Sequence, residues 1–454
     1  MSAPWTTPSQ GQQRLWIAEE MASEGVYNVP VGLRMQGDLN EGALLTAIHG
    51  IVSRHESLRC LLRLDDEGRL SCVIQEPASF GVEQVDLTGI DDATDRLAEF
   101  AVTFSRRRFV LAGEVLRIAM VRMAARDYVL LVVGHHVVFD DWGVALFFRE
   151  LEVGYAAACQ GSEPDRLLPP LDHGYAELAA AEQSGINSGY LERQTAYWSD
   201  RLAGALPCEL PLDRPRPIVP TGSGVPLFFS MPDPFGTHLM KIGREHGATG
   251  FMTAVAVFHA LLRRRTGRED ITVGTPVSGR TSAERERLII NMVNIIAIRS
   301  QLPGKPRFVD LLGEVRNAVL GAFANQDAPL GDALGRLRAR NPQGRPADIR
   351  LLFELQNTDS HMGAFLGVTD DLPVFAGLHT SAYLIPDMTV RYDLEMKIAV
   401  TGSGRLEGLL VYSPDIFEED TMRALIDEFQ AIIRAVVRDP FIVTDEAQLS
   451  MGDG

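Results

Sequence analysis

The residues best suited to chemistry are two histidines and two aspartates within seven positions, His135, His136, Asp140 and Asp141. They follow the apolar run 128–133, whose β-branched residues without polar alternation are typical of a strand buried on both faces. Histidine titrates near neutrality and can take a proton from an attacking amine or hydroxyl. The pattern therefore indicates a general base on a rigid strand, although two adjacent histidines also occur as ordinary core or surface residues.

A family resemblance favours the functional interpretation. The pattern His135-His136-x-x-x-Asp140 resembles the HHxxxDG signature of condensation domains from nonribosomal peptide synthetases, which share a fold with chloramphenicol acetyltransferase. Other segments are similar to the family's motifs in the same order, and they are Ser9 to Trp16 (SxAQxRLW), Arg54 to Arg59 (RHExLR), Tyr175-Ala176 (YxDYA), Asn294 with Arg299 (FVNTxxxR), Asn325 to Leu330 ((H/N)QDxPF) and Arg338 to Pro342 (RDxSRNP). The resemblance extends from residue 9 to the C-terminus.

The resemblance implies an α/β fold, layered as α+β, in which two chloramphenicol-acetyltransferase-like halves form a V-shaped pseudo-dimer. A tunnel would pass through the junction, with His136 midway along it. We expect the first half at residues 1–180, a connecting helix and proline-rich linker at 181–226, and the second half at 227–454. The five prolines and two glycines between residues 210 and 227 indicate the linker, because they interrupt regular structure.

The same resemblance assigns roles within the site. His136 would remove, or simply order, the proton of the attacking group, while His135 would support the structure. Asp140 resembles a structural acid that pairs with an arginine across the domain junction; Arg280 is the preferred partner and Arg299 the second choice. The acyl group would arrive on the phosphopantetheine arm of a carrier protein, so no bound cofactor is expected.

Asp141 stands where the family usually has glycine. It restricts the backbone and adds a carboxylate beside the reacting groups. The X domains of glycopeptide synthetases, inactive relatives that recruit oxygenases, resemble HRxxxDD and share the second aspartate, but they lack the second histidine. Retention of His136 favours catalysis. An epimerase-like relative is a further alternative, although the segment 243–247 is only superficially similar to the EGHGRE segment of that class.

The absence of adenylation and carrier segments in 454 residues predicts a free-standing enzyme that acts in trans on a carrier protein. The acceptor would be a small-molecule alcohol or amine, giving an ester or an amide; we favour an alcohol slightly. The donor acyl group, the acceptor, the carrier, the stereochemistry, the oligomeric state and the effect of Asp141 stay open at this level.

Composition narrows the remaining classes. A net charge of −17 would repel nucleic acid and anionic lipid, so neither is an expected partner. The triplets 106–108 and 263–265, all arginine, are candidate docking sites for an acidic carrier. The four cysteines lack CxxC spacing, which predicts neither a metal site nor a disulfide framework. With no leader and no membrane-length apolar stretch, we expect a cytoplasmic protein.

Hydrophobic periodicity locates the elements that carry the site. We expect helices near 40–54, 142–160, 251–265 and 422–436, strands near 128–133, 271–273 and Phe353, and a hairpin from 394–400 and 406–411. The histidine motif then lies on a strand-to-helix turn, where the helix N-terminus favours both aspartates. Trp142 is expected in the core, and Arg54, His55, Glu56 and Arg59 are expected to form a buried polar cluster.

Overall fold

The computed structural model describes residues 5–22, 25–77, 80–162, 167–171, 174–187, 189–340, 348–356, 361–366, 372–386 and 388–444. It divides into two compact units, and each unit combines segments that are far apart in the sequence. Unit 1 comprises residues 1–188, 280–293 and 359–387, and unit 2 comprises residues 189–279, 294–358 and 388–454. The units therefore differ from the contiguous halves expected from the sequence, because two segments of the C-terminal half belong to unit 1.

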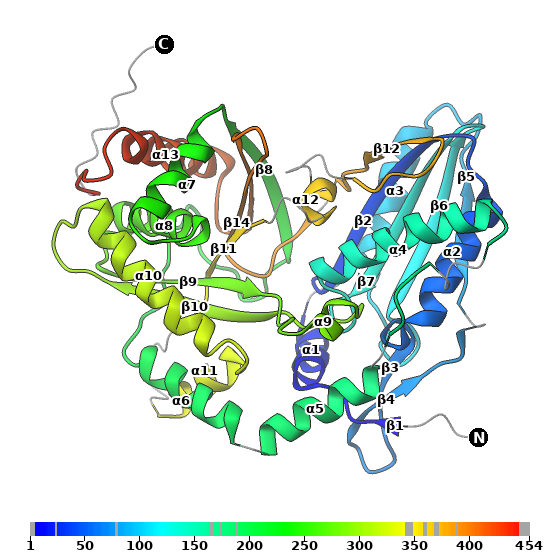
Figure 1. Cartoon of the computed structure of the whole chain (residues 1–454), viewed down its shortest axis with the longest axis horizontal. Helices are drawn as coiled ribbons and strands as arrows, with labels where there is room; N and C mark the ends of the chain where they lie inside the picture. Colours follow the sequence, from blue (N-terminus) through cyan, green and yellow to red (C-terminus); the bar gives the residue numbers. More distant parts are fainter. Residues whose placement is uncertain are drawn as a thin grey trace. The chain divides into compact units, whose positions relative to one another are not determined.

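Unit 1 contains a five-stranded sheet in the order β12-β2-β7-β6-β5 and a three-stranded sheet in the order β1-β4-β3 (Figure 1). Its strands are β1 (Trp5–Thr6), β2 (Asn28–Gly37), β3 (Cys60–Leu64), β4 (Leu70–Ile74), β5 (Val82–Asp86), β6 (Leu116–Ala124), β7 (Asp127–His135) and β12 (Leu378–Ala382). Its helices are α1 (Gln10–Met21), α2 (Glu41–Arg54), the 3-10 helix η1 (Glu56–Arg59), α3 (Ala93–Arg106), α4 (Asp141–Cys159), α5 (Tyr175–Asn187), α9 (Ala283–Glu286) and α12 (His361–Phe365).

Unit 2 contains a seven-stranded sheet in the order β10-β9-β11-β14-β15-β8-β13. Its strands are β8 (Ser223–Met231), β9 (Asp270–Val277), β10 (Asn294–Gln301), β11 (Leu351–Leu355), β13 (Met388–Thr389), β14 (Leu394–Val400) and β15 (Leu406–Tyr412). Its helices are α6 (Tyr190–Arg201), α7 (Phe235–Glu245), α8 (Gly250–Thr266), α10 (Phe308–Ala324), α11 (Leu330–Arg340) and α13 (Glu419–Arg438). The helices, strands and antiparallel hairpin predicted from periodicity are all confirmed.

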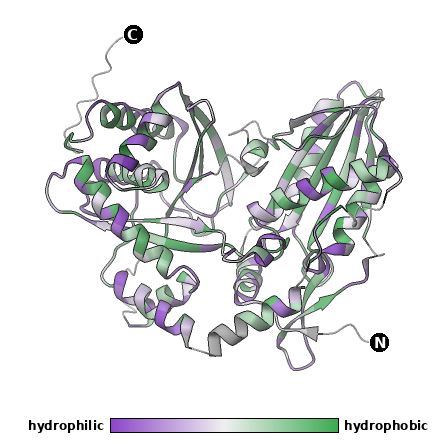
Figure 2. Cartoon of the chain, viewed as in Figure 1, coloured by the Kyte–Doolittle hydropathy of each residue, from purple (hydrophilic) through white to green (hydrophobic). Residues whose placement is uncertain are grey.

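Strand β7, which ends at His135, is the central strand of its sheet. It pairs antiparallel with β2 on one side and with β6 on the other, and every residue from Tyr128 to His135 is buried. The strand is correspondingly apolar, as Figure 2 shows for β6 and β7. A strand hydrogen-bonded along both edges and covered on both faces has little freedom to move. The residue at its end is therefore held firmly.

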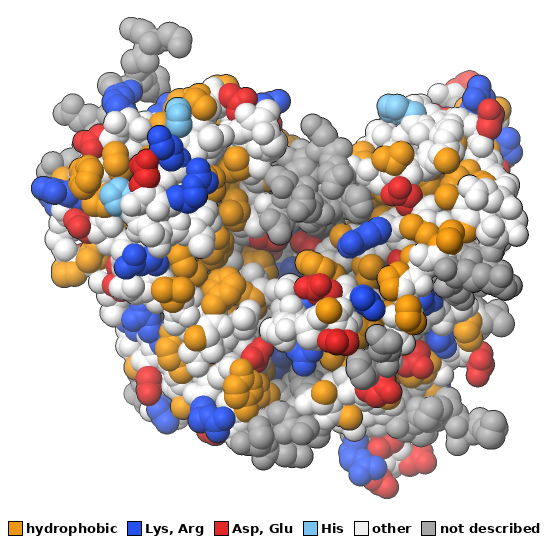
Figure 3. Space-filling model, viewed as in Figure 1, with side chains coloured by type: hydrophobic (Ala, Val, Ile, Leu, Met, Phe, Trp, Pro, Cys, Tyr) orange, Lys and Arg blue, Asp and Glu red, His pale blue; other side chains and the backbone are white. Residues whose placement is uncertain are grey.

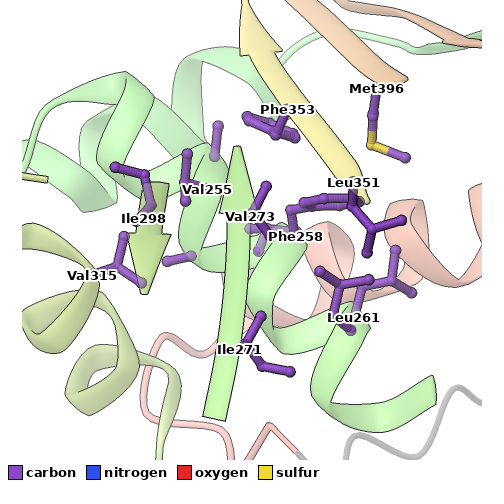
Figure 4. Packing of buried hydrophobic residues seen from close by; sticks show 14 of the residues in the cluster. Val255, Phe258, Leu261, Ile271, Val273, Ile298, Val315, Leu351, Phe353 and Met396 are labelled. Carbon is purple, nitrogen blue, oxygen red and sulfur yellow. The ribbon is translucent and has the colours of Figure 1, made fainter. Parts of the chain in front are cut away.

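The described side chains form two separate hydrophobic cores, one in each unit. In unit 2, helix α8 lies against the sheet, and Phe258 of α8 stacks on Phe353 of β11 with ring centroids 5.1 Å apart (Figure 4). Val273 of β9 and Met396 of β14 belong to the same cluster. Each unit thus has the buried core of an independent domain.

Two of the four cysteines are bonded to each other, so the expectation of no disulfide was wrong. Cys60 on β3 and Cys72 on β4 form a disulfide with Cα atoms 5.7 Å apart. They are twelve residues apart, but antiparallel pairing sets Cys72 opposite Leu62 and brings it diagonally next to Cys60. Cys159 and Cys208 are free thiols. Spacing in the sequence could not reveal this pairing, because the hairpin register determines it.

The buried His259 on α8 predicts a dependence of stability on pH. Burial lowers the pKa of His259 to about 3, and its Nδ1 lies 2.7 Å from Ser300 Oγ. The unfolded chain binds a proton at this histidine near pH 6.5, so stability is lost as the pH falls below that value. Between pH 7 and pH 5 the loss from one such group is about 2 kcal/mol. We expect His259→Asn to remove this part of the pH dependence in urea denaturation.

The exposed His238 of α7 provides the matched control. The variant His238→Asn should keep the wild-type pH dependence. Equal slopes for wild type and His259→Asn would contradict the prediction.

Candidate active site at the end of strand β7

The turn after β7, here named the histidine turn (residues 135–140), is held by hydrogen bonds of its backbone. His136 N donates to Tyr27 O at 2.8 Å, while Val138 N and Phe139 N donate to His135 O at 3.0 and 3.1 Å. Buried amide and carbonyl groups without partners cost about 1–3 kcal/mol each, so pairing them stabilises one turn geometry. The turn therefore has a defined conformation before any substrate binds.

His135, the first histidine of the pair, is fully buried. Its Nδ1 accepts a hydrogen bond from Val137 N at 3.0 Å, and its Nε2 lies 3.3 Å from Glu19 Oε2. Burial lowers the pKa of His135, and the hydrogen bond to Glu19 opposes this effect. Since Nδ1 is occupied as an acceptor, the ring is neutral and carries its hydrogen on Nε2. This side chain braces the turn from inside the core.

His136, the second histidine, is the less buried of the two. Its backbone is held on both sides, because its N–H donates to Tyr27 and its carbonyl accepts from Asn291 Nδ2 at 2.5 Å. The turn thus keeps the first histidine buried and leaves the second partly exposed. A partly exposed imidazole on a rigid turn is suited to proton transfer.

Asp140 ends the turn and begins helix α4. Its Oδ1 accepts from Gly143 N at 2.7 Å, which caps the helix. Its carboxylate also receives two hydrogen bonds from Arg280, at 2.7 and 3.0 Å, and one from Met292 N at 3.0 Å. The Asp140 and Arg280 side chains are only 0% and 1% exposed, so a two-pronged contact with additional donors is needed to offset the loss of hydration.

The preferred partner from the sequence, Arg280, is thus the residue that binds Asp140. Arg280 also donates to Ile290 O at 2.8 Å and to Leu288 O at 3.4 Å. The resemblance suggested a pair across a junction, but both residues belong to unit 1, because the segment 280–293 between β9 and β10 is part of that unit. The pair organises the site within a single unit.

Arg299, the second choice, lies in unit 2 and has a different partner. Its guanidinium donates to both carboxylate oxygens of Asp270, at 2.9 and 2.6 Å. Further hydrogen bonds reach the carbonyls of Arg201 and Ala203 at 2.8 and 3.0 Å. This side chain joins β10 to β9 and the end of α6, and the structure does not bring it to Asp140.

Asp141 is the first residue of α4. Among the described residues only glycines have a positive φ, so the backbone at this position accepts an ordinary side chain. Replacing the family's usual glycine therefore costs no backbone strain here. The carboxylate lies in the first helical turn, where the helix dipole favours negative charge. Compared with the family's usual glycine, Asp141 adds a negative charge beside the histidine turn.

Trp142 departs from the expectation of a core residue. The residue is 36% exposed, and its Nε1 donates to Glu286 O at 2.9 Å. The guanidinium carbon of Arg280 lies 5.7 Å from the ring centroid. The indole therefore covers the Asp140–Arg280 pair rather than filling the core, because its polar edge finds a carbonyl on the 280–293 segment.

Gly134 allows the turn to pack. A Cβ at this position would lie 2.4 Å from Phe139 Cδ1, closer than any carbon contact allows. The ring of Phe139 is fully buried and meets the Phe147 ring edge-on, with centroids 6.0 Å apart. Only glycine lets the chain fold back on itself at this distance.

Of the four residues expected to form a buried polar cluster after α2, His55 is buried, whereas Arg54, Glu56 and Arg59 are only partly buried. Arg59 donates to the carbonyls of Val52 and Ser53 and does not join the other three. His55 Nε2 lies 2.9 Å from Glu150 Oε2, Arg54 Nε lies 3.4 Å from the same oxygen, and Ser57 Oγ donates to Ile289 O. Arg54, His55 and Ser57 line a pocket of about 430 Å³, and Leu288 and Ile290 line it too. The cluster thus supports the segment that holds Arg280.

Sequence reasoning missed several side chains that hold the turn. They are Gln12 and Glu19 of α1 and Asn291 of the 280–293 segment. Gln12 stands inside a matched motif, but no spacing in the sequence shows that it reaches a turn 125 residues away. The sequence held no indication for Glu19, because a glutamate in a helix is usually exposed and only the structure shows that this one is buried.

The arginine triplets are largely engaged in structural contacts. Arg263 donates to the carbonyls of Leu302 and Gly304, and Arg264 and Arg265 both pair with Glu428, so the second triplet does not form a basic docking area. In the first triplet, Arg108 pairs with Glu19, while the Arg107 side chain is 52% exposed. On the face seen in Figure 3, acidic and basic side chains are interspersed.

The comparisons agree with this fold. The family model of the condensation domain matches residues 6–450. A linear gramicidin synthase protein of Brevibacillus parabrevis is 32% identical over 441 residues, which cover 95% of this chain and 6% of that protein. The chain therefore belongs to the condensation domain family, whose members transfer acyl or aminoacyl groups in nonribosomal peptide synthesis. It spans only a small fraction of the length of the multidomain relatives that it matches.

Solved structures show the same fold. The X-domain from teicoplanin biosynthesis superposes with a TM-score of 0.84 at 23% identity, covering 98% of both chains. The starter condensation domain of rhizomide synthetase, solved in complex with C8-CoA, gives a TM-score of 0.80 at 19% identity, covering 97% of both chains. The predicted family and the predicted two-lobed α/β fold related to chloramphenicol acetyltransferase are confirmed.

In the described residues, no helix is both long and apolar enough to cross a bilayer. The same residues contain no group of three or more histidine, cysteine, aspartate or glutamate side chains that could hold a metal ion.

The Asp140–Arg280 pair predicts a sharp difference between two conservative substitutions in one segment. Lysine at position 280 cannot donate two parallel hydrogen bonds, and it would leave Asp140 buried and poorly paired. We expect Arg280→Lys to lower the free energy of unfolding by about 3 kcal/mol. The exposed Arg287 lies in the same segment, and Arg287→Lys should change it by less than about 0.5 kcal/mol. Urea denaturation measures both, and similar values for the two variants would contradict the assignment.

Proposed function

We propose that this chain catalyses condensation: it transfers an acyl or aminoacyl group from the phosphopantetheine thioester of a carrier protein to an alcohol or amine acceptor. The observation that carries the proposal is the intact histidine turn, in which His136 is held by backbone hydrogen bonds on both sides while His135 stays buried. Membership of the condensation domain family supports the same reaction. The proposal invokes no cofactor bound by this chain.

The reaction needs one base and one oriented turn. The acceptor's nitrogen or oxygen attacks the thioester carbonyl, and His136 takes or orders the proton that the acceptor loses. The tetrahedral intermediate then collapses, the carbon–sulfur bond breaks, and the thiolate of the phosphopantetheine arm receives the proton. Holding two reactants in line contributes about 7–11 kcal/mol in favourable cases, so positioning by the rigid turn supports the reaction as well as proton transfer.

Asp140 and Arg280 act through the turn. Their pair is fully buried, so neither group is available to exchange a proton with substrate. Its effect is to fix the start of α4 and with it the end of the turn that carries His136. Asp141 is the residue of the motif that adds charge near the histidine, and we propose that it orients an acceptor hydroxyl or ammonium group through a hydrogen bond.

A second candidate is a non-catalytic recruitment domain. Asp141 supports this candidate, because its place in the motif resembles the second aspartate of the HRxxxDD pattern of X domains. The X-domain from teicoplanin biosynthesis also shares the fold over 98% of both chains. The two candidates differ in one consequence: a recruitment domain binds its partner whether or not His136 is present.

The test is an acyl-transfer assay with a separately supplied, aminoacyl-loaded carrier protein and parallel panels of alcohols and amines, followed by mass spectrometry. We expect product with the wild type and a loss of about 100- to 10,000-fold in kcat for His136→Ala, the range for removing a general base. The product mass distinguishes ester from amide. His379→Ala, at an exposed position of strand β12, is the matched control and should keep full activity.

Unchanged turnover in His136→Ala would contradict the role of this histidine. Absence of product with every acceptor, together with equal binding of the loaded carrier by wild type and His136→Ala, would favour the recruitment domain.

A further inference from the structure

Helix α1 holds the histidine turn at two points. Near its N-terminus, Gln12 Nε2 donates to Val137 O at 3.0 Å, and the Gln12 amide oxygen accepts from Tyr175 OH at 2.5 Å. Near its C-terminus, Glu19 Oε2 lies 3.3 Å from His135 Nε2. The residue between these contacts along the turn is His136. The helix therefore contacts the turn on both sides of the partly exposed histidine.

Glu19 is a buried carboxylate with two partners. Only 2% of its surface is exposed, and its Oε1 lies 3.2 Å from Arg108 Nε. Arg108 also donates to the backbone carbonyl of Glu19 at 2.9 Å, while 40% of the arginine side chain stays exposed. A buried carboxylate needs a cation such as Arg108 as its partner. Arg108 itself does not require that carboxylate to be buried, because a carboxylate at the surface could pair with it equally well. The burial brings the second oxygen to His135.

The hydrogen bond to Val137 decides what Glu19 does to His135. Val137 N–H points at Nδ1, so a hydrogen on Nδ1 would set two donors against each other. The remaining ring hydrogen must therefore sit on Nε2, where it needs an acceptor. Glu19 is that acceptor. The contact between Glu19 and His135 thus fixes the tautomer of His135, and this tautomer in turn holds the Val137 amide, which directly follows His136.

The other groups around His135 keep its ring neutral. The charged groups that act on it are Glu19, Arg108 and Arg117, and the two cations and burial oppose protonation. The Phe109 ring lies 5.8 Å from the imidazole and separates it from Arg117, whose guanidinium carbon is 3.7 Å from the Phe109 centroid. A neutral ring with its one hydrogen in a defined place supports the turn structurally and does not carry protons.

We propose that Glu19 is a positioning residue for the condensation reaction: by accepting the Nε2 hydrogen of His135 it fixes the turn through Val137 and thereby places His136. The inference rests on the proposed function for its kinetic consequence. Glu19 exchanges no proton with substrate, and its effect passes through His135 and the Val137 amide.

The experiment compares three variants in the full chain. Glu19→Ala removes the acceptor, Glu19→Gln keeps an acceptor oxygen without the charge, and Glu20→Ala is the matched control. Glu20 is the adjacent residue, its side chain is 59% exposed, and it pairs with Arg108 at 3.5 Å. We expect Glu19→Ala to lower kcat about 10- to 100-fold at an unchanged KM for the loaded carrier, the size of effect caused by a small displacement of a reacting group. Glu19→Gln and Glu20→Ala should stay near wild type.

A spectroscopic measurement separates positioning from simple loss of stability. With nitrogen-15-labelled histidine, long-range proton–nitrogen spectra distinguish Nε2–H from Nδ1–H tautomers, and the variants His135→Phe and His136→Ala assign the two signals. We expect His135 as Nε2–H in the wild type, and a shifted His136 signal in Glu19→Ala but not in Glu20→Ala. A His135 hydrogen on Nδ1, or wild-type kcat in Glu19→Ala, would overturn the proposal.

Two further outcomes are decisive. If the wild type forms no product, the proposed function fails, while an unshifted His136 signal in Glu19→Ala would separately overturn the positioning role. If Glu19→Ala does not fold, His135→Phe keeps the ring volume and lacks both nitrogens, and it should reproduce the loss of kcat. In a folded double variant, Glu19→Ala should cause no further loss of kcat beyond that of His135→Phe, because both remove the Glu19–His135 contact and the Arg108 pair that Glu19→Ala also removes does not involve the turn.

Discussion

The buried carboxylate of Asp140 is the group on which the geometry of the site depends. It caps helix α4, binds Arg280 through both oxygens and accepts a hydrogen bond from the backbone amide of Met292. A carboxylate removed from water is tolerated only when each of these donors is in place, so the start of α4 and the segment 280–293 must adopt one arrangement together. Arg280 extends the constraint to the carbonyls of Leu288 and Ile290. The site is therefore assembled from distant segments by one charge that needs full compensation.

The turn between β7 and α4 shows how two adjacent histidines acquire different properties. His135 faces the core, where burial and hydrogen bonds at both nitrogens leave it neutral and immobile. His136 is partly exposed, yet its backbone is as tightly bonded as that of its neighbour. The buried first ring and the bonds of the backbone together fix the position from which the second side chain extends. Preorganisation of this kind lowers the cost of bringing a base to a reacting group.

The second aspartate of the motif is tolerated because of where the helix begins. Position 141 has a helical backbone and lies in the first turn of α4, so it requires neither glycine's freedom nor a neutral side chain. The same fold accommodates X domains and condensation domains, so the fold alone does not separate recruitment from catalysis. A distinction between recruitment and catalysis has to come from the residues of the turn, where this chain carries His136.

The sequence by itself determined the family, the nature of the elements and the motif residues. The uninterrupted apolar run of β7, the helical periodicity of the helices before and after it, and the order of the motifs are all local properties of the chain. It also favoured Arg280 over Arg299 as the partner of Asp140. Only the tertiary structure decided which segments share a unit, that Cys60 bonds Cys72, that Trp142 covers the ion pair, and that Glu19 and Gln12 brace the turn. The contacts of Trp142, Gln12 and Glu19 each join residues more than 100 positions apart, and they arise because buried polar groups must find partners wherever the packing places them.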